Sequence, residues 1–264
     1  MEIKEIQSLL KELLIDVESV FDNLGVNYYL AYGTLLGAKR HHGFIPWDDD
    51  VDLFVPRKDY YLLEEKYNRL AEKSFFFSTK TNSDYFFPFA KISLNSTQSK
   101  QRTHNTPRSL GVSIDIFPID MLPSTKWKRE LCFYSMKLLN RSIGTYHKEY
   151  TLCSKKDAIL WIFGKVFGYK NMLVVSNRIV KSLNSKPRAW IGNLVWGSYH
   201  HADIFPTDFL GNIRKMDFEG LSLRVPEKSE ALLKLWYDDY MQLPSKEEIE
   251  KCAHHFNELY ECIE

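Results

Sequence analysis

Apolar residues recur at helical spacing through the first 24 residues of the chain. A glycine, Gly25, follows the last of them, at the position where helices often end in a left-handed turn. The pattern predicts an amphipathic helix over residues 3–24. Its apolar positions are Ile3, Ile6, Leu9, Leu10, Leu13, Leu14, Val17, Val20, Phe21 and Leu24.

Shorter apolar runs separated by turn residues follow this helix. A strand is expected at residues 26–32, broken by Gly33, after which Thr34 is expected to cap a short helix. A polar stretch at residues 95–108 has the composition of a loop. The remaining runs predict strands at residues 51–55, ended by Pro56, at 75–78, at 87–93 and at 112–117, closed by Pro118, with a helix at 58–73.

The pattern changes after Pro123 to long helical stretches. These predict helices at residues 126–146, 156–166 and 171–183, a mixed region from Trp190, and closing helices at 229–240 and 246–259. Ser245 and Glu248 have the spacing of a capping box at the start of the last helix. We expect one folding unit, composed of a core at residues 1–120, a helical segment at 121–189 and a C-terminal part at 190–264 that packs on the core.

Composition and charge add two constraints. With 44% hydrophobic and 26% charged residues the chain is an ordinary globular protein, and its net charge of +1 argues against a general nucleic-acid binder. Residues 124–188, however, hold 14 lysines and arginines against three acidic residues, so this segment carries +11 and the remainder −10. The apolar side chains there predict either an interfacial helix pair that binds anionic lipid or a lipid-linked acceptor, or a helical cap with a solvated basic face. They are Trp161, Ile162, Phe163, Val166 and Phe167.

The chain carries no sign of export or of a membrane span. Its four cysteines form no C-x-x-C pair, and Met1 leads into a charged amphipathic stretch instead of an apolar leader. The most apolar window, residues 158–175, is interrupted by Lys165 and Lys170. We therefore expect a cytoplasmic protein, with the inner face of the cell membrane as an alternative location.

The densest chemical signal is a run of four aspartates within five residues, at positions 48, 49, 50 and 52. In a strand Asp50 and Asp52 would share a face about 7 Å apart, a spacing that suits one metal ion. Asp115, between Ile114 and Ile116, is the natural third carboxylate because an aspartate in an apolar strand is costly unless it ligates or pairs. These residues predict a site for Mg²⁺, with Mn²⁺ as an alternative.

The acidic run could also form one of two other structures, an EF-hand loop or a solvated acidic turn. An EF-hand loop fits Asp48, Asp50 and Asp52 at its first, third and fifth positions, but Leu53 replaces its glycine and Asp59 replaces its final glutamate. A solvated acidic turn would need no bound ligand. The nearby Gly33–Thr34 turn favours a ligand-binding site instead, because free N–H groups at a helix start can hold a phosphate.

Five segments of the chain resemble motifs of the LicD family. The resemblance rests on YGTLLGAKR at residues 32–40, GFIPWDDDVD at 43–52, FAKI at 89–92, GVSIDIFPID at 111–120 and YMQLP at 240–244 with the histidines at 254–255. It implies an α+β fold, with a DNA polymerase β-like nucleotidyltransferase core whose mixed sheet is flanked by helices, plus the helical basic segment. Bacterial members transfer phosphocholine from CDP-choline to sugars of lipopolysaccharide, teichoic acid or other surface glycans.

The resemblance also implies roles for individual residues. It places metal binding and catalysis on Asp50, Asp52 and Asp115, and donor-phosphate binding on Gly33 and Thr34. It gives supporting positions around the donor to Asp48, Arg40, Lys91 and His255. Related CDP-linked donors of ethanolamine, glycerol or ribitol phosphate stay open, as do a nucleotidyltransferase on a sugar or headgroup phosphate and a non-catalytic membrane- or glycan-binding module.

Overall fold

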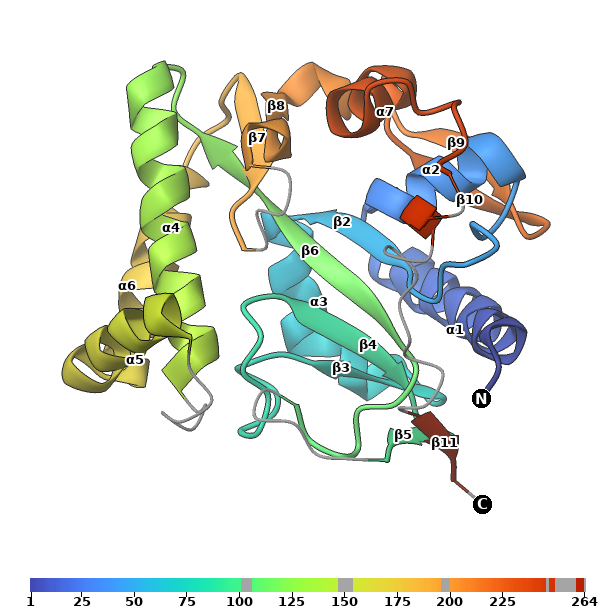
Figure 1. Cartoon of the computed structure of the whole chain (residues 1–264), viewed down its shortest axis with the longest axis horizontal. Helices are drawn as coiled ribbons and strands as arrows, with labels where there is room; N and C mark the ends of the chain where they lie inside the picture. Colours follow the sequence, from blue (N-terminus) through green and yellow to red (C-terminus); the bar gives the residue numbers. More distant parts are fainter. Residues whose placement is uncertain (101–105, 147–153, 196–199, 246, 250–259, 264) are drawn as a thin grey trace.

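The computed structural model describes residues 1–100, 106–146, 154–195, 200–245, 247–249 and 260–263 (Figure 1). The helices are α1 (Ile3–Leu24), α2 (Tyr32–His41), α3 (Arg57–Leu70), α4 (Lys126–Tyr146), α5 (Lys155–Phe167), α6 (Tyr169–Leu183) and α7 (Ser229–Tyr237). The strands are β1 (Tyr29–Leu30), β2 (Asp52–Pro56), β3 (Ser74–Phe77), β4 (Ala90–Leu94), β5 (Thr97–Ser99), β6 (Ser113–Leu122), β7 (Trp190–Asn193), β8 (Ile204–Pro206), β9 (Arg214–Phe218), β10 (Leu221–Val225) and β11 (Tyr260–Cys262). The predicted α+β class is confirmed.

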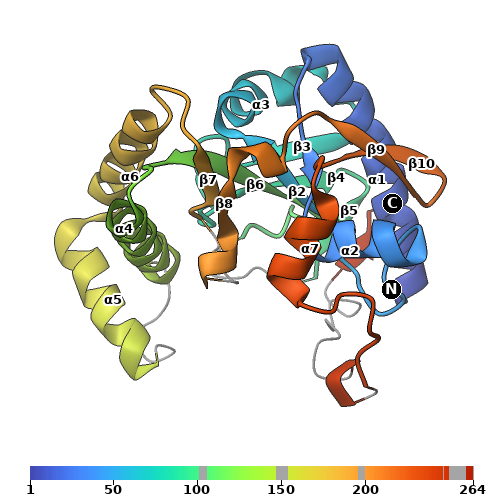
Figure 2. The same cartoon turned by 90° about the horizontal axis from the view of Figure 1, so that it is seen from above.

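A mixed sheet forms the centre of the molecule. Its strands run in the order β1-β2-β6-β4-β3, and β7 and β8 extend it along the second half of β6. Strands β2 and β6 are parallel, whereas the other pairs in this sheet are antiparallel. Figure 2 shows α1 and α3 on one side of the sheet and α2 and α7 on the other.

Strand β6 continues past the proline at which the sequence predicted its end. The N–H of Asp115 donates to Val51 on the β2 side, so the alternation of the strand directs position 118 away from β2. On that side β4 pairs only as far as Ile116 and β7 begins at Ile119. Pro118 therefore lies in a gap of the ladder, where its missing N–H removes no hydrogen bond.

The segment around Gly33 differs from its prediction. The strand is only Tyr29–Leu30, and α2 already begins at Tyr32 with Ala31 as the N-cap, so Thr34 is not the cap. The buried hydroxyl of Thr34 instead accepts the Asp52 N–H at 2.8 Å. Tyr32 has a φ of 42°, which is unusual for a residue other than glycine. Its hydroxyl donates to Asp203 and accepts from Asn193, and these bonds tie this strained turn to the C-terminal part of the chain.

Some of the other predicted elements are confirmed, and others have different bounds. The helices predicted at 3–24 and 126–146 and the capping box of Ser245 and Glu248 are confirmed. Strand β4 begins three residues later than predicted, and β5 lies inside the predicted loop because it pairs with β11 from the other end of the chain. Helix α7 ends at Tyr237. Of the last predicted helix, only residues 247–249 are described.

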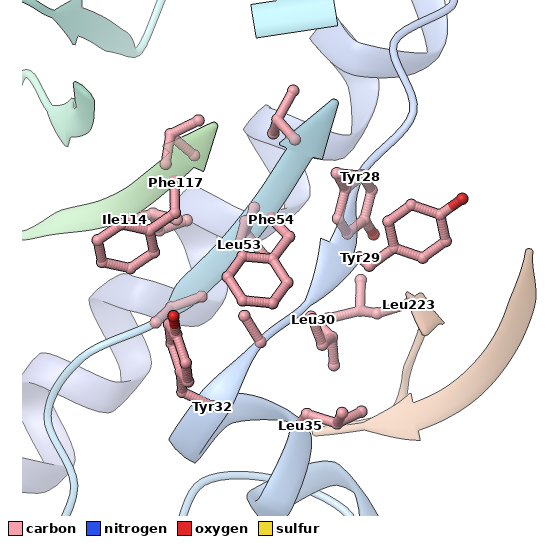
Figure 3. Close-up of a cluster of buried hydrophobic side chains, with 14 of the residues drawn as sticks. Tyr28, Tyr29, Leu30, Tyr32, Leu35, Leu53, Phe54, Ile114, Phe117 and Leu223 are labelled. Atoms are coloured by element: carbon pink, nitrogen blue, oxygen red, sulfur yellow. The ribbon is translucent and has the colours of Figure 1, made fainter. Parts of the chain in front are cut away.

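The apolar interior consists of two main clusters. The larger contains α1, the sheet and α7, and its aromatic part surrounds Phe54, whose ring lies 5.0 Å from Tyr32 and 5.8 Å from Trp236 (Figure 3). The smaller joins α4 and α6 to Leu122 and Leu194. The basic helices are therefore packed on a cluster at the end of β6.

A buried ion pair joins the two clusters. Asp120 of β6 is fully buried and accepts hydrogen bonds from Arg57 at 2.8 and 2.6 Å and from Asn184 at 2.7 Å. Arg57 begins α3 and Asn184 follows α6, so one carboxylate holds the core, α3 and the basic helices together. Its hydrogen bonds offset much of the cost of burying it.

Within the described residues, no single helix is long and apolar enough to cross a membrane. Helices α5 and α6 together, over Asp157–Phe167 and Tyr169–Leu183, meet the criteria of length and composition, but they are bent by 93° at the break between them.

Replacement of Asp120 tests the joint between the two clusters. Asp120→Asn leaves the buried Arg57 guanidinium without a counter-charge, so we expect the free energy of unfolding to fall by about 3 kcal/mol in urea denaturation. Asp208→Asn, which breaks an exposed ion pair with Lys228, is the control and should leave the midpoint unchanged. Equal effects of the two substitutions would contradict this account of the joint.

Candidate active site

Three charged residues form a row across neighbouring strands of the sheet. Asp52 of β2 lies directly opposite Asp115 of β6, and Asp115 lies directly opposite Lys91 of β4. Residues paired in this way point to the same face of a sheet. Lys91 forms an ion pair with Asp115, and both side chains are largely buried. The sheet thus brings together three residues that are far apart in the sequence.

The other aspartates lie in the segment that leads into β2. Asp50 precedes the strand, which begins at Asp52, so the prediction of both residues within one strand is wrong. The carboxylates of Asp48 and Asp50 lie close enough for the charge of Asp50 to act on Asp48. The side-chain amide of Gln7 in α1 donates to the Asp48 carbonyl at 2.7 Å and so fixes this segment from a helix 41 residues earlier in the chain. Asp49 is buried, with 6% of its surface exposed.

Two motif glycines allow close approaches around these aspartates. A Cβ on Gly33 would lie 2.9 Å from the Asp48 carboxylate, so the absence of a side chain there lets this carboxylate approach the start of α2. A Cβ on Gly37 would lie 2.4 Å from the Gly43 carbonyl, where backbone crosses backbone. Both glycines are therefore explained by close packing of the motif on itself.

Burial and neighbouring carboxylates raise the pKa values of Asp48, Asp52 and Asp115. Burial, followed by the neighbouring Asp50 carboxylate, raises the pKa of Asp48 to about 9. Burial and the charges of Asp50, Asp115 and Asp48 raise the pKa of Asp52 well above its usual value. The pKa of Asp115 is also raised by burial, although Lys91 opposes the shift. The cluster therefore holds protons that a cation can displace.

Lys91 is the cation nearest to Asp115 in this arrangement. Burial alone would lower its pKa, but Asp115 and other neighbouring groups raise it above the usual lysine value, so the ammonium stays charged. Its Nζ also lies 5.8 Å from the ring centroid of Phe87 and 5.5 Å from that of Phe89. The aromatic rings and the carboxylate together hold this lysine at the edge of the cluster.

The start of α2 provides backbone donors beside the aspartates. The first hydrogen bond of the helix runs from the Leu35 N–H to the Ala31 carbonyl, so the N–H groups of Gly33 and Thr34 have no acceptor within the helix. Such groups, together with the helix dipole, suit a phosphate. The Thr34 hydroxyl holds Asp52 in place through its N–H, which links this helix start to the row of charged residues.

Of the other two sequence candidates, the structure describes only Arg40. Arg40 lies in the last turn of α2, at the opposite end from Gly33, and donates to the Tyr240 carbonyl at 3.2 Å and to the His41 ring at 2.9 Å. It therefore ties α2 to the segment that follows α7. His255 lies outside the described residues.

Sequence reasoning missed two residues that the structure associates with the site. Gln7 gives no signal among the polar positions of an amphipathic helix, and Tyr260 of β11 reaches the cluster only through the pairing of β11 with β5. Burial raises the pKa of Tyr260, and Lys91 and Asp115 are among the charges that act on it. Neither contact is local in sequence.

The donor set suits a hard cation such as Mg²⁺ in charge and in chemical type. Four carboxylates lie near one another, with Lys91 beside Asp115. Across the described parts of the chain, however, no three Asp, Glu, His or Cys side chains converge closely enough to enclose an ion by themselves. Mg²⁺ usually takes one or two carboxylates and completes its shell with water and substrate phosphates, so the residues fit an ion that binds together with a phosphate ligand.

The fold and the site together define a class of protein: a mixed α+β domain with an acidic cluster beside the start of a helix. Residues 25–142 match the family model described as LicD/FKTN/FKRP, nucleotidyltransferase domain. This match supports the resemblance to the LicD family over these residues.

Individual relatives extend this comparison. The chain is 25% identical to the lipopolysaccharide cholinephosphotransferase LicD of Haemophilus influenzae, over 98% of this chain and 97% of the relative. It is 48% identical to the human and mouse ribitol 5-phosphate transferase FKRP over 50 residues, which are 19% of this chain and 10% of theirs. An uncharacterized protein of Rickettsia prowazekii, RP689, is 40% identical over 50 residues, 19% of each chain.

The raised pKa of Asp48 predicts a pH dependence of stability. A carboxyl that binds its proton more tightly in the folded state makes the free energy of unfolding fall as the pH rises from its unfolded pKa of 3.8 to about 9. We expect this in urea denaturation with EDTA, by up to about 1 kcal/mol per pH unit. Asp48→Asn does not titrate, so its decline should be shallower.

Asp217→Asn on the exposed face of β9 is the matched control and should keep the wild-type slope. Parallel pH profiles of Asp48→Asn and the wild type would contradict a proton held on Asp48.

Proposed function

We propose that this protein transfers phosphocholine, or a related alcohol phosphate, from a CDP-linked donor to a hydroxyl of a cell-surface glycan such as lipopolysaccharide or teichoic acid. The proposal rests on the row of Asp52, Asp115 and Lys91 across neighbouring strands, beside the start of α2. This arrangement combines carboxylates, a cation and free N–H groups in one place. The two named kinds of relative support it, since both transfer an alcohol phosphate. The proposal includes a polymerase β-like arrangement of the core.

In this proposal Asp50, Asp52 and Asp115 hold Mg²⁺, or Mn²⁺ in its place, together with the diphosphate of the donor. The bound ion would supply positive charge that offsets the mutual repulsion of the carboxylates and of the phosphates. Asp48 supports the set as a neighbouring carboxylate beside Asp50.

The start of α2 and Lys91 bind and orient the donor. The Gly33 and Thr34 N–H groups donate to phosphate oxygens, in the manner of other helix starts that hold phosphates. Lys91 carries a fixed positive charge at the edge of the same cluster and balances negative charge that develops on the leaving phosphate.

Transfer requires one bond to form and one to break. The acceptor hydroxyl oxygen attacks the phosphorus that bears the headgroup, and the bond from that phosphorus to the bridging oxygen breaks, so CMP leaves with the electron pair. The hydroxyl proton passes to a carboxylate oxygen of Asp115. Asp115 lies in the row of charged residues beside the start of α2, so its carboxylate is placed next to the proposed donor site.

Release of CMP tests the proposal and identifies the headgroup. CDP-choline, CDP-ethanolamine, CDP-glycerol and CDP-ribitol are supplied in parallel with a crude surface-glycan extract as acceptor, with Mg²⁺ or with EDTA. We expect Mg²⁺-dependent CMP release from one donor. Asp52→Asn should lower the rate at least about 100-fold, because it removes charge where the donor phosphates and the ion meet.

Asp217→Asn is again the matched control and should keep the wild-type rate. Release of the headgroup phosphate, such as phosphocholine from CDP-choline, in place of CMP would reassign the chain as a nucleotidyltransferase. CMP release that is unchanged in Asp52→Asn or in EDTA would contradict the proposed site.

A further inference from the structure

Helix α5 presents an apolar face that no other part of the described chain covers. Its large side chains at spacings of three and four residues are 38–84% exposed, and none of them belongs to an interior cluster. They are Ile159, Ile162, Phe163, Val166 and Phe167. An ordinary surface helix buries its apolar stripe, so this arrangement indicates a surface that meets an apolar environment elsewhere.

The contacts of α5 with α4 fix the direction of this face. Asp157 forms an ion pair with Arg141 of α4, and a Cβ on Gly164 would lie 3.3 Å from the Ser142 carbonyl. On a helix of 3.6 residues per turn, Asp157 and Gly164 lie opposite Ile159 and Val166. The apolar face therefore points away from α4, at the edge of the molecule furthest from the central sheet (Figures 1 and 2).

A second exposed apolar stripe runs along α4. Its members are between 47% and 62% exposed, and they follow one another at intervals of three or four residues: Trp127, Leu131, Tyr134 and Leu138. Arg141 continues the same stripe and contacts α5. Helix α5 therefore lies on the side of α4 that carries the stripe. We call the α4 stripe and the α5 face together the outer apolar surface.

The charge around this surface is strongly positive. Residues 124–188, which contain α4, α5 and α6, carry +11 in a protein whose remainder carries −10. Among the exposed basic side chains are Lys126, Lys128, Lys165, Lys170 and Arg178. Apolar and aromatic side chains surrounded by lysine and arginine are the combination by which helices bind in the interface of an anionic membrane.

We infer that the outer apolar surface binds an anionic phospholipid membrane, with α5 lying in the interface plane and exposed basic side chains of the segment at the headgroups. A second copy of the chain fits this surface less well, because two such faces would bring two segments of +11 together. The inference does not rest on the proposed transferase activity. Lipid binding is measured without donor or acceptor, so either can fail alone.

Vesicle flotation of the full chain tests the inference. The vesicles contain phosphatidylcholine with about 30% phosphatidylglycerol, or phosphatidylcholine alone, and the expected result is binding to the anionic vesicles that weakens as NaCl rises. The double variant Ile159→Gln with Val166→Gln should lower the affinity at least about tenfold, because it removes apolar groups that enter the interface. Ile15→Gln with Leu70→Gln, exposed positions on α1 and α3, is the matched control and should bind as the wild type does.

Circular dichroism checks that each variant keeps its helix content, and sedimentation velocity records the oligomeric state. Wild-type protein that stays unbound with all vesicles would overturn the inference, as would anionic binding that the α5 variant leaves unchanged. A dimer that the α5 variant alone dissociates, without binding to vesicles, would overturn it too and identify a second copy as the occupant.

Discussion

The parallel pairing of β2 with β6 is the constraint on which the rest of the structure depends. At the start of the two strands it sets Asp52 opposite Asp115, and at their end it leads to Arg57 and Asp120. In the pair of Arg57 and Asp120, hydrogen-bond donors satisfy the carboxylate. The first pair is left with more carboxylates than cations, so one sheet carries an ion pair at one end and an acidic cluster at the other.

The excess of carboxylates explains why the acidic site needs so much support. Asp48, Asp50, Asp52 and Asp115 repel one another, and their segment is held by Gln7 from α1, by the Thr34 hydroxyl and by the close approach at Gly33. In the proposed function, a divalent cation bound with the donor phosphates would offset this repulsion, so stability given up at the site would favour their binding.

Much of the site could be predicted because its residues lie in strands and turns that the local pattern reveals. The apolar neighbours of Asp115 and the acidic run before Leu53 marked the two carboxylate strands, and the helices at 3–24 and 126–146 followed from periodicity alone. The rest depends on contacts between distant segments. Strand β5 exists only through β11, Pro118 is tolerated only because β4 ends before β7 begins, and Tyr32 keeps its left-handed turn beside Asp203 and Asn193.

In the proposed function, the carboxylates of β2 and β6 bind a divalent cation together with the donor diphosphate. Mn²⁺ binding followed by electron paramagnetic resonance, with and without the CDP-linked donor, measures this directly. The account predicts that the donor tightens Mn²⁺ binding, that binding strengthens as the pH rises because protons are displaced, and that Asp115→Asn weakens it at least about tenfold. Mn²⁺ binding that responds neither to the donor nor to the loss of the Asp115 carboxylate would contradict the account.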